Sequence, residues 1–328
     1  MTTGEPATRH GHETPRILII GAGAIGCLYG AILSRAGLVV SLVARSACEQ
    51  IRQHGVRVQS AELGCLDWQP DRVYADATDV VSQPDILILT VKVLDDLDRV
   101  ALIRPAVGPD TTVVLISNGL DIEAPIAEAL PDNPLISCIA FVAASRTAPG
   151  TVEHKAYGRL VLGDYPCGAG ETARTLADWI EAGGVTAKVT DQVITERWRK
   201  AVWNAAFNTV SVAGGGVTTS EMLAAPGGEA MMEVLMREVC AVAEAAGHPL
   251  PAELPGKSLR STHNIRDYYT SMALDYLAGR PLELEAITGN VLRTAQRLGV
   301  ATPHLQDMYT LATLQVTRKS RKEPPTSG

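Results

Sequence analysis

Several patterns that mark particular classes of protein are missing from this 328-residue sequence. Basic residues are not in excess: the net charge is −7, and no Lys- or Arg-rich stripe precedes the C-terminal tail, so nucleic acid is not an expected partner. The six cysteines form no C-x-x-C pair and no Cys/His cluster, which argues against a disulfide framework or metal site and favours reduced thiols in the cytoplasm. The polar stretch 1–15 lacks the apolar core of a signal peptide.

A membrane span is also not expected. The segment from Ile17 to Leu33 carries no charge, but it is short for a span, and glycines recur through its middle. A buried strand, a glycine turn and a helix account for this composition better.

The first half of the sequence alternates short apolar runs with helical stretches. The runs, rich in Ile, Val and Leu, occupy residues 16–20, 38–45, 85–90, 111–117 and 134–145. Continuous apolar strands separated by helices are typical of a parallel sheet that helices cover on both faces.

The pattern changes in the second half. Residues 150–164 predict a pair of strands that turn at Tyr157-Gly158, and helical periodicity dominates from Asp191 onward. The length and the ordinary globular composition favour two domains. We predict an α/β chain with a Rossmann-type doubly wound sheet over residues 16–190 and an all-α substrate and catalytic domain over 191–316. A flexible leader over 1–15 and a flexible tail over 317–328 are expected at the ends.

A glycine-rich turn directly follows the first apolar run. The sequence G-A-G-A-I-G has glycine at Gly21, Gly23 and Gly26, and Ala24 and Ile25 open the next helix. The glycines allow close approach of a ligand, and the free N–H groups of the helix N-terminus suit a pyrophosphate. This context indicates a dinucleotide site; the alternative is a tight strand–helix turn without a ligand.

The end of the second strand indicates which dinucleotide is bound. An NAD site commonly places an acidic residue there to bind the ribose 2′-hydroxyl, but here the strand ends in Arg45 and Ser46. A guanidinium group suits the 2′-phosphate of NADP. The sequence therefore favours NADP, unless Arg45 is merely a surface charge.

Two more polar residues follow predicted strands. Lys92 comes after the run at 85–90, and Asn118 comes after the run at 111–117. Open α/β sheets bind ligands at the carboxyl ends of their strands, so both are candidate site residues. A solvated lysine and a turn-forming Asn-Gly pair are the alternatives.

The stretch WRKAVWNAAFN places Lys200, Asn204 and Asn208 four residues apart in a helix that is otherwise mostly apolar. At 100° per residue they span only about 80°, a narrower sector than a solvent-facing side usually has. A partly desolvated lysine is suited to proton transfer near neutral pH. We interpret the row as lining a cleft; the alternative is that the asparagines bond to a neighbouring element.

A second group of polar residues follows later in the sequence. Ser271 and Asp275 stand four apart on a predicted helix, and Glu283 follows a Gly-Arg-Pro break. Acidic residues on helix surfaces are common, so this group alone carries little weight.

Taken together, these motifs resemble the ketopantoate reductase family. The resemblance runs from about Arg16 to Leu314 and rests on the ordered set GAGAIG, TVK, SNG, PGTVEHKAYGRLVLGD, WRKAVWNAAFN, TSMALD, GRPLELEAITG and LGVATPH. It implies a Rossmann domain, a helical C-terminal domain and a cleft between them. The implied activity is NADPH-dependent reduction of a 2-oxo acid, ketopantoate to pantoate in pantothenate biosynthesis, and the family is compatible with a homodimer.

The resemblance also implies residue roles. Lys200 is the expected general acid, and Glu283 is expected to orient it or to bind the substrate hydroxyl. The expected substrate contacts are Asn118, Asn204, Asn208, Ser271 and Asp275. The expected cofactor contacts are Gly21, Gly23, Ala24, Ile25, Gly26, Arg45, Lys92 and Asn118.

The chain also departs from the family pattern. Leu282-Glu283-Leu284-Glu285 stands where T-E-I-D is common, Thr288-Gly289 replaces an Asn-Gly pair, and His304 occupies a place where an Asn often follows. These departures leave two alternatives open: a reductase of a different 2-oxo acid, and an NADPH-binding sensor that does no chemistry.

Overall fold

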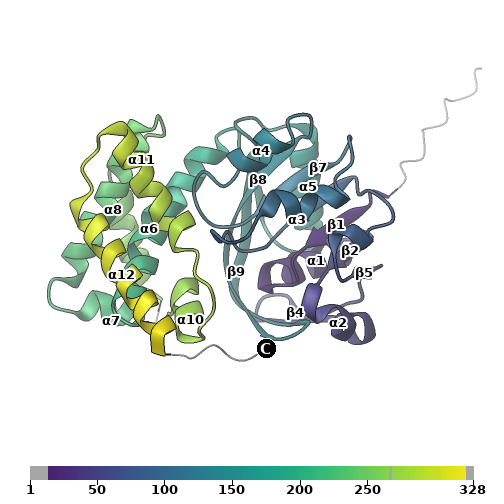
Figure 1. The fold of residues 1–328 in the computed structure, drawn as a ribbon, viewed down its shortest axis with the longest axis horizontal. Coiled ribbons are helices and arrows are strands. Elements are labelled where there is room, and N and C mark those ends of the chain that lie inside the picture. The colour runs from purple at the N-terminus through teal and green to yellow at the C-terminus, as the bar shows by residue number, and fades with distance from the viewer. Residues whose placement is uncertain (1–13, 266–267, 323–328) are drawn as a thin grey trace, which may run out of the picture.

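A computed structural model describes residues 14–265 and 268–322. Within them, ten strands form one sheet, to which a group of helices is joined at one side (Figure 1). The strands are β1 (Ile17–Ile20), β2 (Val40–Val43), β3 (Val56–Ser60), β4 (Gly64–Trp68), β5 (Val73–Tyr74), β6 (Ile86–Leu89), β7 (Thr112–Ile116), β8 (Leu135–Ala148), β9 (Thr151–Asp164) and β10 (Ala187–Val189). The α-helices among them are α1 (Ala24–Arg35), α2 (Cys48–His54), α3 (Arg99–Ile103), α4 (Ala124–Ala129) and α5 (Glu171–Ala182).

The centre of the sheet is parallel, as predicted. The strand order is β4-β3-β9-β8-β7-β6-β1-β2-β5, and β10 pairs with β9. Strands β5, β2, β1, β6, β7 and β8 run parallel to one another, in the doubly wound arrangement that the sequence indicates. The sheet is mixed overall, because β8 and β9 are antiparallel and so are β3 and β4, a hairpin that the apolar runs did not predict.

The hairpin predicted at Tyr157-Gly158 is wrong. Residues 151–164 form the single strand β9, which pairs with β8 along its length, and the turn lies at Pro149-Gly150. Tyr157 and Gly158 do have positive φ, 68° and 109°, but they form a bulge at which the register with β8 shifts.

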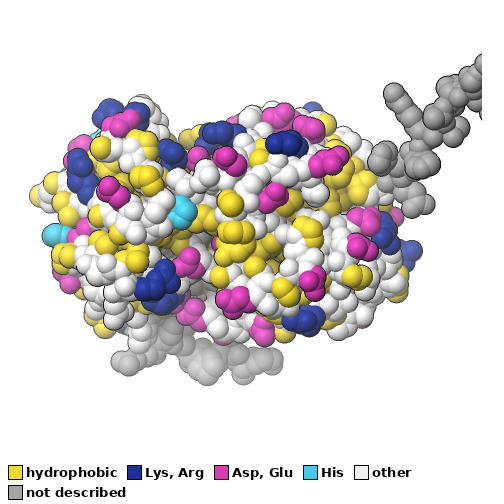
Figure 2. All heavy atoms as spheres, turned by 90° about the horizontal axis from the view of Figure 1, so that it is seen from above, with side chains coloured by type: hydrophobic (Ala, Val, Ile, Leu, Met, Phe, Trp, Pro, Cys, Tyr) yellow, Lys and Arg dark blue, Asp and Glu magenta, His cyan; other side chains and the backbone are white. Residues whose placement is uncertain are grey.

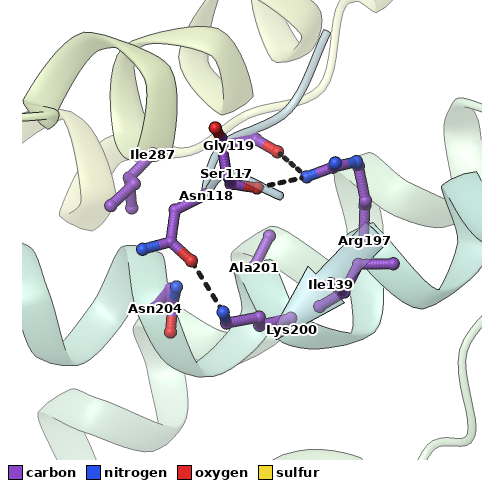
Figure 3. A pocket seen from close by; sticks show the side chains of 9 residues that line it. All are labelled: Ser117, Asn118, Gly119, Ile139, Arg197, Lys200, Ala201, Asn204 and Ile287. Atoms are coloured by element: carbon purple, nitrogen blue, oxygen red, sulfur yellow. Dashed lines mark hydrogen bonds between the residues drawn. The ribbon is translucent and has the colours of Figure 1, made fainter. Parts of the chain in front are cut away.

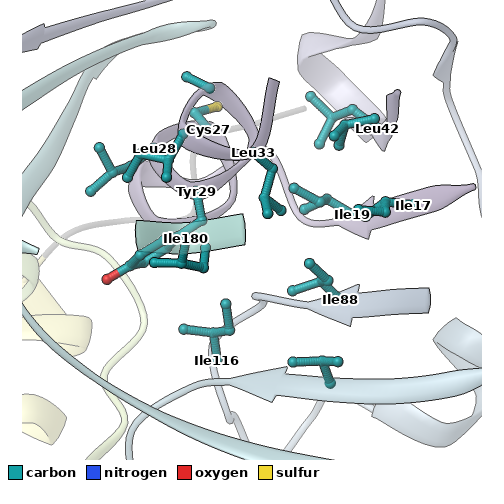
Figure 4. Close-up of a cluster of buried hydrophobic side chains, with 14 of the residues drawn as sticks. Ile17, Ile19, Cys27, Leu28, Tyr29, Leu33, Leu42, Ile88, Ile116 and Ile180 are labelled. Carbon is teal, nitrogen blue, oxygen red and sulfur yellow. The ribbon is translucent and has the colours of Figure 1, made fainter. Parts of the chain in front are cut away.

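Alternate residues of β1 pack against the helices on opposite faces of the sheet. Ile17 and Ile19 face α1, while Leu18 and Ile20 belong to the core on the other side (Figure 4). Gly30 lets α1 lie directly on the aromatic ring of Trp68, because a Cβ at this position would come within 2.2 Å of the ring. These contacts fix the helix that begins at the glycine-rich turn.

The second half is helical, as predicted. Its helices are α6 (Val193–Ala213), α7 (Thr219–Ala224), α8 (Gly228–Ala245), α9 (Leu254–His263), α10 (Ser271–Leu277), α11 (Asn290–Leu298) and α12 (Pro303–Lys322), with a π-helical turn at Glu285–Gly289. Helix α6 is central: Phe207 and Val202 are fully buried in a core with Met232, Leu235 and Val239 of α8. Figure 1 shows α6 reaching from this bundle to the sheet.

The short connection between β10 and α6 contains the expected boundary at 190/191, and we propose it as the domain boundary. The tail expected from 317 is wrong in part, because α12 continues to Lys322. The ammonium group of Lys319 donates to the carbonyl of Tyr276 and lies 4.6 Å from the centre of its ring, which holds this turn against α10. Residues 1–13 of the expected leader and 323–328 of the expected tail lie outside the described residues.

The described helices include none with the length and apolarity that crossing a bilayer requires. On the face drawn in Figure 2, acidic and basic side chains are interspersed over both parts of the molecule.

Candidate active site

The parallel strands bring four predicted site segments to one edge of the sheet. Ile20 at the end of β1 is in register with Val43 of β2 and Leu89 of β6, and Leu89 is in register with Leu115 of β7. The glycine turn, Arg45, Lys92 and Asn118 each follow one of these strand ends. The structure thus places these segments side by side at the carboxyl edge, where open α/β sheets bind ligands.

The glycine turn is shaped by close backbone packing. A Cβ on Gly26 would come within 2.0 Å of the Gly21 carbonyl oxygen, and Gly21 has φ of +118°. The Thr90 hydroxyl donates to the same carbonyl at 2.9 Å and fixes the turn. In contrast, a Cβ on Gly23 would meet no heavy atom within 4 Å. Open space over the first turn of α1 fits a pyrophosphate group on free N–H groups at Ala24 and Ile25.

Arg45 lies where a dinucleotide's ribose is expected. It begins a short 3₁₀ turn directly after β2, has φ of 35° and is exposed. The nearby Asp76 carboxylate is already bonded to the backbone and hydroxyl of Thr78, which lower the pKa of this carboxyl, with a smaller contribution from Arg45. The exposed Arg45 guanidinium group is a candidate contact for an added phosphate.

Helix α6, the segment that follows β7, and β8 line a small pocket (Figure 3). Its lining residues are Ser117, Asn118, Gly119, Ile139, Arg197, Lys200, Ala201, Asn204 and Ile287. The Lys200 ammonium group donates to Asn118 Oδ1 at 2.6 Å and to the Ala140 carbonyl at 2.5 Å. It also lies 5.5 Å from the centre of the Phe141 ring. The structure thus brings together three residues predicted from distant parts of the sequence: Asn118, Lys200 and Asn204.

The environment of Lys200 favours the neutral amine. Burial, and then the charge of Arg197, lower the pKa of Lys200 from 10.5 to about 7, while Glu283 acts in the opposite direction. Glu283 lies before the π-helical turn, and its Oε1 accepts from the Val93 backbone N–H at 3.0 Å. Burial raises the pKa of Glu283 above its ordinary value. An ammonium group with a pKa near 7 is suited to donating a proton to a reacting oxygen.

Two other predicted substrate contacts, Asn208 and Ser271, differ in their exposure. Asn208 is 1 % exposed, and its Oδ1 accepts from the Met272 backbone N–H at 3.2 Å, which ties α6 to α10. This contact is the bonding to a neighbouring element that the sequence left as the alternative. Ser271 is exposed at the first turn of α10.

Lys92 and Asp275 connect the two parts of the molecule. The Lys92 ammonium group lies 2.7 Å from Asp275 Oδ2 and donates to the Pro281 carbonyl at 3.1 Å, and Arg280 holds the other oxygen of Asp275 at 2.8 Å. In this structure Lys92 therefore contacts the helical part across the cleft, and its assignment to the cofactor stays a prediction.

Sequence models of two adjoining regions match the chain: "Ketopantoate reductase PanE/ApbA" over residues 17–166 and its C-terminal counterpart over 192–315. A 2-dehydropantoate 2-reductase from Nostoc sp. is 33% identical, with 89% of this chain and 92% of the relative covered. The chain belongs to the ketopantoate reductase family.

Solved structures of similar proteins agree with this assignment. The 2-dehydropantoate 2-reductase of Methylococcus capsulatus superposes with a TM-score of 0.88 and 45% identity, covering 95% of this chain and 99% of that one. The 2-dehydropantoate 2-reductase of Geobacter metallireducens superposes with a TM-score of 0.86 and 30% identity, covering 91% of this chain and 99% of that one. The predicted family and fold are confirmed, and the chain is an NADP-dependent oxidoreductase of the ketopantoate reductase type that uses a nicotinamide cofactor, NADPH in this family.

One prominent residue of the site escaped the sequence interpretation. Arg197 lines the pocket beside Lys200, is 4 % exposed, and donates to the carbonyl of Ser117, just after β7, and to that of Cys138 in β8. On the helical wheel it falls at about 60° from Lys200, between Asn204 and Asn208. The polar row thus begins one turn before Lys200, at the residue that directly precedes the stretch WRKAVWNAAFN.

Proposed function

We propose that this reductase transfers hydride from NADPH to the C2 carbonyl of a 2-oxo acid, ketopantoate to pantoate in pantothenate biosynthesis. The observation that carries the proposal is Lys200, an amine with a pKa of about 7 that lines a pocket with Asn118 and Asn204 at the carboxyl edge of a nucleotide-binding sheet. We also propose that it acts in the cytoplasm, in keeping with its dispersed free cysteines.

The nicotinamide, when bound, supplies the hydride, and the protein's own residues handle charge and position. The turn at Gly21–Gly26 would receive the pyrophosphate, and Arg45 the 2′-phosphate. As hydride reaches C2, negative charge develops on the carbonyl oxygen. Lys200 stabilises that charge and donates its proton, so the product leaves as the hydroxy acid.

Side chains around Lys200 would hold the substrate. Asn118 already bonds Lys200 and is placed to orient it, and Asn204 lies beside both in the pocket. The exposed Ser271 hydroxyl is a candidate contact for the substrate carboxylate, with Asp275 and Asn208 supporting from buried positions. Glu283 is a candidate partner for Lys200 or for the substrate hydroxyl.

The departures from the family pattern involve contacts away from the pocket. Glu285 bonds Arg293 at 2.6 Å and also Tyr309, and Thr288 shares a buried hydrogen bond with Thr209. His304 bonds Glu238, whose carboxylate also accepts the first N–H groups of α12. Replacements at these positions therefore support the fold and do not argue against ketopantoate.

A different 2-oxo acid is the second candidate. A D-mandelate dehydrogenase solved with NADH and anilino(oxo)acetate has the same fold, with a TM-score of 0.83 and 24% identity, which bears on the fold alone. The test follows NADPH absorbance with ketopantoate, a series of branched 2-oxo acids and an aryl 2-oxo acid. The highest kcat/KM should belong to ketopantoate. Oxidation of NADPH by none of these acids, despite tight NADPH binding, would instead support the sensor alternative.

We also propose a homodimer. A ketopantoate reductase from Staphylococcus aureus, similar in fold at 20% identity, is described as dimeric. Sedimentation equilibrium over a range of concentrations tests this, and a single species of 34.8 kDa would refute it.

A further inference from the structure

The buried Arg197 joins the first turns of α6 to the sheet. Its guanidinium group donates to the Ser117 and Gly119 carbonyls at 2.9 and 3.2 Å, to the Cys138 carbonyl at 3.3 Å and to the Ser137 hydroxyl at 2.8 Å. These acceptors lie on β8 and on the segment after β7. A planar group with several donors in a fixed fork can bond two segments in a defined geometry, which the freely rotating ammonium group of a lysine does not impose.

Arg197 is paired with a buried acid. Its guanidinium group forms an ion pair with Glu123, in which the two side chains are 3% and 1% exposed, and Ser137 donates to the same carboxylate oxygen at 2.6 Å. Arg99, 8 % exposed, is a second cation near Glu123. Burying such charges costs several kcal/mol per ion, and an apolar pair often packs as stably. Packing alone is therefore a weak explanation for this group.

Lys200 lies one turn after Arg197 and contacts the same two segments, the one after β7 and β8. Arg197 bonds the carbonyls of Ser117 and Cys138, while Lys200 bonds the side chain of Asn118 and, two residues further along β8, the carbonyl of Ala140. Two successive turns of α6 therefore dock on the sheet in a fixed register (Figure 3). A shift of Arg197 would move Lys200 relative to Asn118.

We propose that Arg197, held by Glu123, is a positioning residue that fixes the Lys200 ammonium group against Asn118 and presents a buried positive charge to it. The proposal rests on Lys200 being the proton donor, as in the proposed function. It adds that the donor's place and its readiness to release a proton are set by the buried side chain one turn before it.

Charge supports the same assignment. After burial, Arg197 is the next largest influence that lowers the pKa of Lys200. The other groups around Lys200 are Glu283, which raises this pKa, Arg159, stacked at 4.4 Å on the Phe141 ring, and the Cys138 thiol, which burial keeps neutral. Glu283 is in turn influenced by Lys92 and Asp275. Removal of the Arg197 charge should therefore raise the pKa of Lys200.

The test compares Arg197→Lys, Arg197→Met and Glu123→Gln with Arg199→Met. Arg199 is the matched control, because it lies on the same helix but is 37% exposed and pairs with Glu196. Arg197→Lys keeps the charge and loses the fork, so kcat should fall by about tenfold to a hundredfold with KM changed less than about threefold. Arg197→Met should also shift the alkaline limb of the reduction upward by about one pH unit. Glu123→Gln should give a smaller fall in kcat, and Arg199→Met should resemble the wild type.

A second readout does not need turnover. The rate at which Lys200 is acetylated at each pH, followed by mass spectrometry of its peptide, reports the pKa of the amine directly. An upward shift in Arg197→Met supports the proposal even if no tested 2-oxo acid is reduced. Equal pH midpoints in the wild type and Arg197→Met overturn the electrostatic part. An unchanged kcat in Arg197→Lys overturns the positioning part. If Arg197→Met does not fold, Arg197→Lys still tests the proposal.

Discussion

Lys200 combines features that an ordinary surface lysine does not have: a pKa of about 7, two short hydrogen bonds and a place in the pocket beside Asn118. A general acid typically contributes 10²–10⁴-fold to rate. We therefore expect Lys200→Ala to lower kcat by about that factor, while the affinity for NADPH, measured by fluorescence titration, is retained. Lys188→Ala, an exposed lysine of β10, is the control. A loss below tenfold would exclude Lys200 as the proton donor.

The same amine predicts opposite pH dependences for the two directions of the reaction. Reduction needs the protonated amine, so kcat/KM for the 2-oxo acid should fall as the pH rises through about 7. Oxidation of the hydroxy acid needs the neutral amine as a base, so its rate should rise over the same interval. Initial rates from pH 5.5 to 9.5 in both directions test this. Parallel profiles would show that another group controls the proton.

We propose that the choice of NADP over NAD depends on Arg45. Its exposed guanidinium group follows β2, and no acidic residue occupies the end of that strand. Arg45→Ala should raise KM for NADPH by about tenfold or more and leave KM for NADH nearly unchanged, because only NADPH carries the 2′-phosphate. Arg57→Ala, an exposed arginine of β3, should alter neither. Equal effects on both cofactors would refute the assignment.

At the scale of elements, we expect the glycines of the turn between β1 and α1 to have different roles, Gly26 in folding and Gly23 in binding. A Cβ on Gly26 would meet the Gly21 carbonyl at 2.0 Å, whereas one on Gly23 would enter open space. Gly26→Ala should therefore lower the free energy of unfolding by about 1–3 kcal/mol or more.

Gly23→Ala should leave stability without cofactor unchanged, since the residue has φ of −80°. Its added methyl group should raise the Kd for NADPH by about tenfold or more, because it occupies the space that the pyrophosphate needs. Thermal unfolding with and without NADPH distinguishes the two variants. A Gly23→Ala protein that binds NADPH normally would place the pyrophosphate elsewhere.

Elements with an unbroken apolar pattern were predictable from the sequence. Features that depend on contacts with distant segments of the chain were not. The runs that became β1, β6 and β7 are buried on both faces, so their composition alone identifies them. Tyr157 and Gly158 have positive φ, as residues of a tight turn often do. Only their pairing with β8 shows that they form a bulge within one strand and not a turn between two strands. Likewise the end of α12 depends on the contact of Lys319 with Tyr276, which no local pattern shows.

The same division applies to the site. Strand-end positions identified Asn118 and the glycine turn, because parallel strands carry their ends to one edge. The narrow polar sector of α6 identified Lys200 and Asn204, but it did not distinguish Asn208, which bonds Met272, from a pocket residue. Arg197 lay in that sector too. Its significance depends on Glu123, 74 residues earlier in the chain, and such pairing is visible only once the chain is folded.

At the scale of the whole molecule, charged side chains join the helical part to the sheet. Lys92 contacts Asp275, Arg197 contacts the segment after β7, and Lys200 contacts β8. Each contact holds a charge or a proton-binding group in a partly buried interface. The arrangement that makes Lys200 a ready proton donor should therefore carry a cost in stability that varies with pH.

Lys200→Met removes that cost. In the unfolded chain the amine has a pKa of 10.5 and in the folded chain about 7, so between these values the unfolded state binds more protons and wild-type stability rises with pH. Below pH 7 the wild type bears the full free-energy cost of holding a charged ammonium group. The free energy of unfolding of the variant, relative to that of the wild type, should therefore be highest there. From pH 7 to 9 the wild type should gain about 2 kcal/mol relative to the variant. Urea unfolding of both proteins at several pH values measures this gain, and the hydrogen bonds lost at Asn118 and Ala140 add only a constant offset. A pH-independent difference would mean that Lys200 titrates as an ordinary surface lysine.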